Sequence, residues 1–123
     1  MPEDLSSIRN GVDLVEIDRF NATFTKEREY FERSVFTEKE MRSFKNKEKD
    51  ISHLAGLFAA KEAVIKCWRV GGGRWREVVI AHTEEGAPYI EHCAFSAESW
   101  EGSLSISHDG NYAAAFAVFI RRK

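Results

Sequence analysis

The chain contains few of the residues that cross-link or interrupt a fold. Only two of its 123 residues are cysteine, and only two are proline. Cys67 and Cys93 form no CxxC pair and show no metal-ligand spacing, so the sequence does not indicate a zinc site. We expect both to be plain core or interface residues, which is consistent with a reducing compartment.

Long apolar runs and a targeting segment are also missing. No apolar stretch approaches the roughly 20 residues that span a bilayer. The start, Met1-Pro2-Glu3-Asp4, lacks the basic and apolar regions of a signal peptide. The formal net charge of -2 gives no global case for nucleic-acid binding. We therefore expect a cytoplasmic protein with no membrane and no nucleic acid as partner, in which electrostatic attraction comes from local patches.

The composition is that of an ordinary globular protein, with 43% hydrophobic and 31% charged residues. The length predicts a single domain over residues 1–123, because chains of this size rarely divide. Such a domain buries roughly two-thirds of the surface that its unfolded chain exposes. It can therefore form a core without disulfide bonds.

Hydrophobic periodicity and turn residues predict the order of the elements. Strand patterns fall at 8–17, 75–82, 88–95, 102–107 and 112–120. Helices are expected at 18–24, from the capping box at 37–40 to about Lys45, and from about Ile51 to Trp68. The segment 25–36 is charged and aromatic and has no clear pattern, and Asp109-Gly110 signals a hairpin. This order predicts an α+β fold with a largely antiparallel sheet packed against a long central helix.

The central helix is apolar or small all round, which is typical of a buried helix. One arc of it carries small residues, which allow another backbone or a ligand to come close (Ala55, Gly56, Ala59, Ala60, Ala63). Three charged residues interrupt it: Lys61, Glu62 and Lys66. Glu62 and Lys66 stand four apart and favour each other, whereas Lys61 points into the apolar stripe and must extend to a polar edge. Burying a charged side chain costs free energy unless it is paired or coordinates a ligand. We therefore expect each of these three residues to have a partner.

Three segments together resemble the holo-acyl-carrier-protein synthase family of 4′-phosphopantetheinyl transferases. Residues 11–19 (GVDLVEIDR) are similar to the opening motif of that family. Residues 54–66 (LAGLFAAKEAVIK) are similar to its central helix, and residues 104–109 (LSISHD) with 112–115 (YAAA) to its closing motif. Weaker matches at 35–40 and 86–89 occur in family order and at family spacing. The resemblance therefore covers nearly the whole chain.

The resemblance implies a transferase fold and a phosphoryl transfer. A serine hydroxyl of an apo acyl carrier protein attacks the β-phosphate of coenzyme A, phosphopantetheine moves to the serine, and 3′,5′-ADP leaves. It also implies dependence on Mg²⁺, with Asp13 and Glu62 as metal-binding and catalytic carboxylates, a donor type that suits this hard cation. Without the resemblance, the residues alone favour a turn or helix cap for Asp13 and a buried partner of Lys66 for Glu62.

Further roles follow from the matched positions. Lys66 would bind a phosphate oxygen as a catalytic cation, and His108 would contact the coenzyme A phosphates. For Lys61, a phosphate or coenzyme A contact and a structural ion pair remain equal alternatives. Gly71 and Gly72 would border the coenzyme in a glycine-rich loop, or only end the helix. The general base stays open between Glu62 and a bound water.

The family also implies an acidic carrier partner and a subunit assembly. Arg19 matches the family's arginine after the first strand and is the candidate carrier-binding residue. Leu57 is a departure, because the family usually has an arginine there, and this puts substrate affinity or carrier choice in doubt. A homotrimer with coenzyme A bound between subunits is expected. The alternatives are a coenzyme A or carrier-binding module without catalysis, and a structural interaction domain. The sequence does not say which carrier is modified or whether acylated coenzyme A is accepted.

Overall fold

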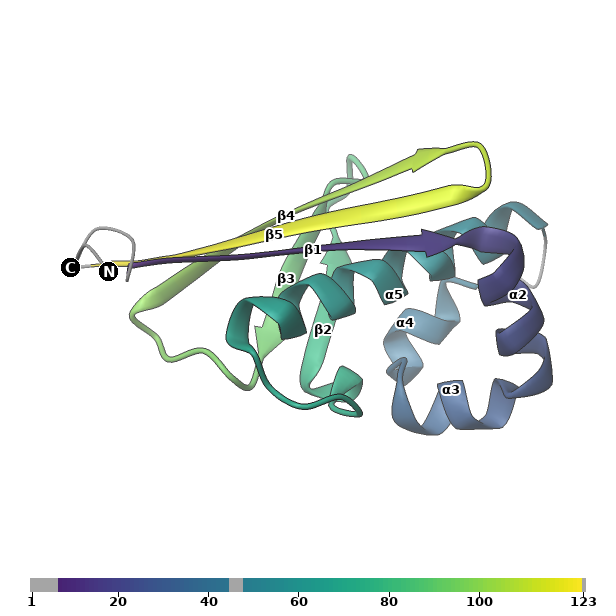
Figure 1. Ribbon diagram of the computed structural model, residues 1–123, viewed down its shortest axis with the longest axis horizontal. Coiled ribbons are helices and arrows are strands. Elements are labelled where there is room, and N and C mark those ends of the chain that lie inside the picture. The colour runs from purple at the N-terminus through teal and green to yellow at the C-terminus, as the bar shows by residue number, and fades with distance from the viewer. Residues whose placement is uncertain (1–6, 45–47, 123) are drawn as a thin grey trace.

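The computed structural model describes residues 7–44 and 48–122 (Figure 1). Its elements follow in chain order: β1 (Ile8–Glu16), α2 (Ile17–Lys26), α3 (Arg28–Ser34), α4 (Glu38–Arg42), α5 (Glu48–Trp68), the 3-10 helix η1 (Trp75–Glu77), β2 (Val78–His82), β3 (Pro88–Cys93), β4 (Trp100–Asp109) and β5 (Tyr112–Arg121).

All strand pairs described are antiparallel. One sheet has the order β1-β5-β4, and the second pairs β2 with β3. The long helix α5 runs beside the three-stranded sheet, and the short helices α2, α3 and α4 gather at one end of the molecule (Figure 1). The predicted α+β fold with a central helix is confirmed.

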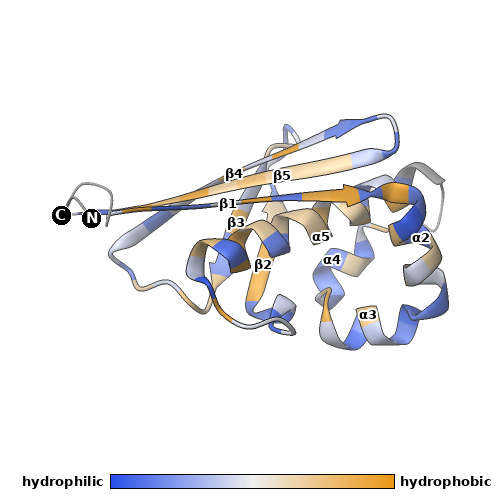
Figure 2. Cartoon of the chain, viewed as in Figure 1, coloured by the Kyte–Doolittle hydropathy of each residue, from blue (hydrophilic) through white to orange (hydrophobic). Residues whose placement is uncertain are grey.

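The central helix is buried, as its composition predicts. Leu54, Ala55, Ala59, Ala60 and Val64 are completely inaccessible to solvent. Figure 2 shows mainly apolar colours along α5, whereas α3 is largely hydrophilic. Phenylalanine rings of α2 and α3 pack with Phe58 of α5, with Phe20 and Phe31 at 5.6 and 6.0 Å between ring centroids. These contacts place the helical end of the molecule against α5.

Strand β1 has two faces with different neighbours. Gly11, Asp13 and Val15 lie on the face turned toward α5, whereas Val12 and Leu14 on the opposite face are 59% and 66% exposed. The predicted alternation is thus present, with the larger apolar residues on the outside. The odd-numbered residues from Gly11 to Val15 therefore face the helix, and the even-numbered ones face away from it.

A close contact between β1 and α5 depends on Gly11. A Cβ atom at this position would lie 2.1 Å from the backbone oxygen of Ala63 and 3.0 Å from the Cβ of Lys66. Glycine therefore allows the strand backbone to lie directly on the helix. Asp13, two residues further on the same face, is brought beside the turn of α5 that carries Glu62 and Lys66.

The β4–β5 hairpin holds the start of α2. Asn111 in its turn accepts the backbone N–H of Ile17 with its carbonyl oxygen at 2.7 Å and that of Asp18 with its side-chain oxygen at 3.0 Å. The two central residues are Gly110 and Asn111, one position later than the predicted Asp109-Gly110, and Gly110 has φ +57°. A positive φ at the first central position suits the right-handed twist of paired strands.

Other boundaries differ locally from the predictions. The unassigned segment 25–36 contains helix α3, and the predicted strand 75–82 begins with the 3-10 helix η1. The capping box is confirmed: Thr37 accepts from the backbone of Glu40, and Glu40 accepts from that of Thr37. The helix that follows ends at Arg42, and the predicted end at Lys45 lies outside the described residues.

Candidate functional site

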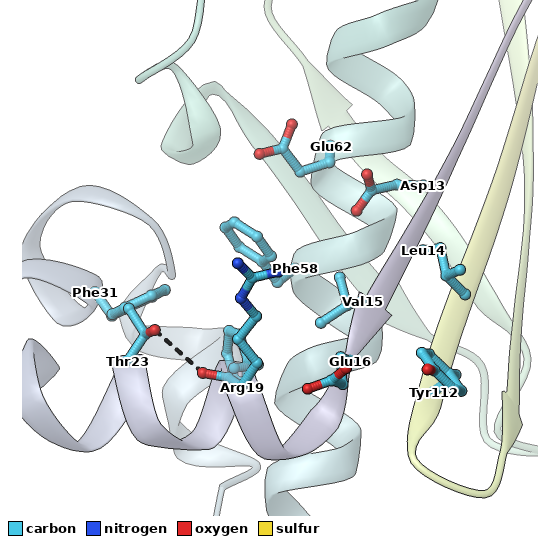
Figure 3. Close-up of a pocket in the computed structure, with 11 residues that line it drawn as sticks. Asp13, Leu14, Val15, Glu16, Arg19, Thr23, Phe31, Phe58, Glu62 and Tyr112 are labelled. Carbon is cyan, nitrogen blue, oxygen red and sulfur yellow. Dashed lines mark hydrogen bonds between the residues drawn. The ribbon is translucent and has the colours of Figure 1, made fainter.

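A pocket of about 480 Å³ opens between the end of β1, helix α2 and helix α5 (Figure 3). Charged side chains share its lining with aromatic and aliphatic ones. Its lining consists of Asp13, Leu14, Val15, Glu16, Arg19, Phe20, Thr23, Phe31, Phe58, Glu62 and Tyr112. Three of the predicted site residues, Asp13, Glu62 and Arg19, therefore line one pocket.

Asp13 and Glu62 lie at the same end of this pocket (Figure 3). Asp13 comes from β1 and Glu62 from α5, and the contact at Gly11 brings the two elements together. The side chain of Asp13 is 15% exposed. The two carboxylates are distant in sequence and neighbours in space, as the metal prediction requires.

Lys66 binds Asp13 and not the partner expected from helical spacing. Its Nζ donates to Oδ1 of Asp13 at 3.0 Å and to the carbonyl of Val12 at 2.9 Å. Within residues 7–44 and 48–122, no ion pair joins Lys66 to Glu62. The pairing predicted from helical spacing is wrong because β1 offers two oxygens to the same ammonium. Lys66 is 52% exposed, so a second anion can still approach it.

Glu62 has a different neighbour. Its Oε1 accepts a hydrogen bond from the indole N–H of Trp75 at 3.2 Å. In the described part of the chain, no residue donates to its Oε2. One oxygen of this carboxylate is thus held in place and the other faces no described donor.

Lys61 is a structural residue in this fold. It is completely buried and forms an ion pair with the equally buried Glu40 at 2.9 Å. Its Nζ also donates to the carbonyls of Trp75 and Val78. The expectation that Lys61 extends to a polar edge is therefore wrong. Burial lowers the pKa of Lys61, and the charge of Glu40 opposes this shift.

All three protons of the Lys61 ammonium are used by these partners. None remains for a coenzyme phosphate, so the structural ion pair is the alternative that the geometry favours. Both oxygens of Glu40 also have partners, since Oε1 accepts from the backbone of Thr37 at 2.8 Å and Oε2 from that of Ile80 at 2.9 Å. The pair joins α4, α5 and β2.

His108 lies outside the lining of the pocket, on β4 against the first half of α5. Its Nε2 is 2.9 Å from the carbonyl oxygen of Ser52, so this nitrogen carries the proton and donates. A Cβ at Gly56 would come within 3.0 Å of the same Nε2. Gly56 thus makes room for the imidazole, a side chain rather than the backbone or ligand expected at the arc of small residues.

The remaining predicted positions have simpler surroundings. Arg19 points from α2 into the pocket (Figure 3). A methyl group at Gly71 or Gly72 would meet no described atom within 4 Å, so these glycines form an open loop after α5. Leu57, in place of the family's arginine, is 2% exposed and belongs to the core. Position 57 therefore contributes apolar packing in this chain and no charge to the site.

The donor set at the pocket fits magnesium better than a transition metal. Two carboxylates with oxygens available are the usual protein contribution for Mg²⁺, which takes its other ligands from phosphates and water. No group of three or more His, Cys, Asp or Glu side chains in the described ranges is placed to hold a metal by itself. A diphosphate substrate would complete such a site.

Trp75, Glu40 and the aromatic side of the pocket were not found from the sequence. Trp75 lies two residues after the three glycines 71–73, and nothing in its local pattern indicates that it would turn back to α5. The need of a buried Lys61 for a carboxylate was visible, but the sequence contains 20 acidic residues and does not single out Glu40. Phe20, Phe31 and Phe58 match helical packing and give no separate signal.

Known proteins resemble this chain in sequence. Residues 9–117 match the family model described as the 4′-phosphopantetheinyl transferase superfamily. Holo-[acyl-carrier-protein] synthase from Thermoanaerobacter sp. is 35% identical, over 89% of this chain and 85% of that protein. The synthase from Chlorobaculum tepidum is 38% identical, over 89% of this chain and 95% of that protein.

Solved structures of the same kind superpose on the chain. An ACPS–CoA complex from Chronobacterium ammoniagenes gives a TM-score of 0.79 at 28% identity, covering 94% of this chain and 98% of that one. A Helicobacter pylori holo-[acyl-carrier-protein] synthase in complex with coenzyme A gives 0.74 at 28% identity, covering 89% and 98%. Among the described residues, no helix is long and apolar enough to cross a membrane.

Proposed function

The chain belongs to the 4′-phosphopantetheinyl transferase superfamily, and we propose that it is a holo-[acyl-carrier-protein] synthase that uses Mg²⁺ at Asp13 and Glu62. It transfers 4′-phosphopantetheine from coenzyme A to a serine of an apo acyl carrier protein and releases 3′,5′-ADP. The observation that carries this function is the meeting of Asp13 and Glu62 at one end of the pocket. A bound Mg²⁺ neutralises phosphate charge and favours attack on the β-phosphorus.

The side chains around the carboxylates position the diphosphate. Lys66 holds Asp13 with one hydrogen bond and leaves half of its own surface open to a phosphate oxygen. The exposed His108 ring would contact a coenzyme A phosphate through the Nδ1–H of its imidazolium form, because its Nε2–H is used by the carbonyl of Ser52. We assign Gly71 and Gly72 to a loop whose backbone the nucleotide of coenzyme A can approach, since a Cβ atom at either position would meet no atom within 4 Å. Lys61 is left out because its donors are used.

Recognition of the carrier is assigned to Arg19. Its guanidinium lies in the same pocket as the two carboxylates and comes from an exposed face of α2. An acidic carrier surface that binds this side chain would bring its serine close to Asp13 and Glu62. The guanidinium also offers several donors to a carboxylate.

The outer face of the β1-β5-β4 sheet supports the proposed homotrimer. Large apolar side chains on this face are 46% to 66% exposed: Ile8, Val12, Leu14, Phe116 and Ile120. Register pairs Ile8 with Ile120 and Val12 with Phe116, so they form one continuous surface. Such a surface is typical of an interface. Because Leu14 and Tyr112 also line the pocket, a neighbouring subunit on this face would border the site.

A cytoplasmic location belongs to the same proposal. Cys67 and Cys93 are both free thiols in the structure, and free thiols persist in reducing compartments.

Transfer is tested by incubating the protein with an apo acyl carrier protein, coenzyme A and Mg²⁺, followed by intact-mass measurement of the carrier. We expect the carrier to gain the mass of phosphopantetheine and the gain to require the metal. Asp13→Asn and Glu62→Gln should nearly abolish it while the chain remains folded. Wild-type transfer by either variant would show that the metal assignment is wrong.

Two further variants separate the binding roles. Arg19→Glu should raise the KM for the carrier much more than the KM for coenzyme A, and His108→Ala should do the reverse. Equal effects of Arg19→Glu on both substrates would contradict the carrier assignment.

A further inference from the structure

Trp75 is held at both ends by consecutive residues of α5. Lys61 donates to its carbonyl oxygen at 3.0 Å, and the indole N–H donates to Oε1 of Glu62 at 3.2 Å. Lys61 is itself fixed by the buried Glu40. The backbone of Trp75 is therefore tied to the core, and its ring is tied to the candidate metal ligand.

The indole ring is also confined by aromatic neighbours. Its centroid lies 6.1 Å from that of Phe58, which lines the pocket, and 6.4 Å from that of Tyr30. A ring with these neighbours and a fixed backbone has little freedom to turn. Its N–H is thus a rigid donor directed at one oxygen of Glu62.

We propose that Trp75 is a positioning residue that orients the Glu62 carboxylate for Mg²⁺ through its indole N–H. The bond to Oε1 restricts rotation of the carboxylate and leaves Oε2, which has no donor among the described residues, for the cation. Hydrogen-bonded partners of metal ligands contribute to affinity in this way because they fix the ligand before the metal arrives. The inference rests on the proposed role of Glu62 in metal binding.

The chain offers a matched control for this donor. The indole N–H of Trp68 is buried and has no hydrogen-bond partner in the described part of the structure. Trp68→Phe therefore removes an indole without removing a bond, whereas Trp75→Phe removes both. Incorporating benzothienylalanine at position 75 provides a closer test, since sulfur replaces the N–H and the ring keeps its size.

The experiment titrates MgCl₂ into each protein in the presence of coenzyme A without carrier and follows binding by calorimetry. We expect Trp75→Phe and the benzothienyl variant to weaken Mg²⁺ binding by about tenfold, the lower part of the range for such partners. Trp68→Phe should bind Mg²⁺ like the wild type. In transfer assays, the Mg²⁺ concentration for half-maximal rate should rise while the KM for the carrier stays constant.

The outcomes separate this inference from the proposed function. If Glu62→Gln loses Mg²⁺ binding and both position-75 variants keep wild-type affinity, Trp75 has no positioning role and the metal site stands. If Glu62→Gln binds Mg²⁺ like the wild type, both proposals fail. If Trp75→Phe unfolds, the benzothienyl variant decides, because it preserves the ring contacts with Phe58 and Tyr30.

Discussion

At the scale of single residues, the partner of a buried charge decides its role. Lys61 and Lys66 are five positions apart on one helix, yet one is enclosed with Glu40 and the other reaches Asp13 at the pocket. Both partners come from other elements. Sequence reasoning identified the charges that need a partner, but local spacing could not choose between partners that arrive only on folding.

Lys61→Met should strongly destabilise the chain. The change leaves Glu40 buried without its cation, and breaking a buried pair in this way costs about 3–5 kcal/mol. The free energy of unfolding in urea measures the loss. Lys39→Met, which breaks the exposed pair with Glu91, is the control and should change little. Equal stability of the two variants would contradict the structural role of Lys61.

At the scale of elements, β1 and α5 form the site because their backbones touch. The strand, the long helix and the final hairpin were predictable because their periodicity and turn residues are strong. Helix α3 was not, since its stability depends on the packing of Phe31 against α2 and α5 rather than on a local pattern. The small residues on the helix indicated that another backbone could approach it, but they did not identify the strand at Gly11 as that backbone.

Gly11→Ala should disturb both stability and metal binding. Its methyl group would overlap the backbone oxygen of Ala63, so β1 must move away from α5 and carry Asp13 with it. Overpacking of this kind costs about 1–3 kcal/mol. Urea unfolding and Mg²⁺ titration measure the two effects. Gly72→Ala, which meets no atom within 4 Å, should leave the unfolding free energy unchanged, and a similar loss there would refute the contact argument.

The junction of α5 with β2 should make stability depend on pH. Burial lowers the pKa of His53 from its ordinary value of 6.5, with His82 and His108 adding to the shift and Asp50 opposing it. The unfolded chain then binds a proton at a higher pH than the folded chain. The free energy of unfolding is therefore fully present above about pH 6.5 and falls as the pH drops below it.

His53→Gln should reduce this dependence. Urea midpoints at pH 7.5 and pH 5.5 should differ less in the variant than in the wild type, because one of the groups that protonate on unfolding is gone. His92→Gln, a change at an exposed residue, is the control and should keep the wild-type difference. An unchanged difference in His53→Gln would show that other groups cause the pH dependence.

At the scale of the whole molecule, the family resemblance predicted fold and function well. Its three motifs lie on β1 with α2, on α5 and on the β4–β5 hairpin, which are the elements that contact one another around the site. A single domain over residues 1–123 and a homotrimer stay predictions.

Phe116→Lys places a charge at the centre of the apolar sheet face and should convert a trimer into monomers. Sedimentation equilibrium measures the mass. Tyr89→Lys, at an exposed aromatic on β3, should leave it unchanged, and a Phe116→Lys trimer would exclude this face.

The alternation of inward and outward residues along β1 limits which sequence changes this strand tolerates. Between Gly11 and Leu14 the odd-numbered positions face α5, where Gly11 allows the close contact and Asp13 supplies the carboxylate, and the even-numbered side chains lie on the outer apolar surface. Inserting or deleting one amino acid there would exchange the two sets, removing the carboxylate from the helix and burying valine and leucine in its place. Point substitutions can tune either face alone, whereas a change in the length of this stretch damages both at once.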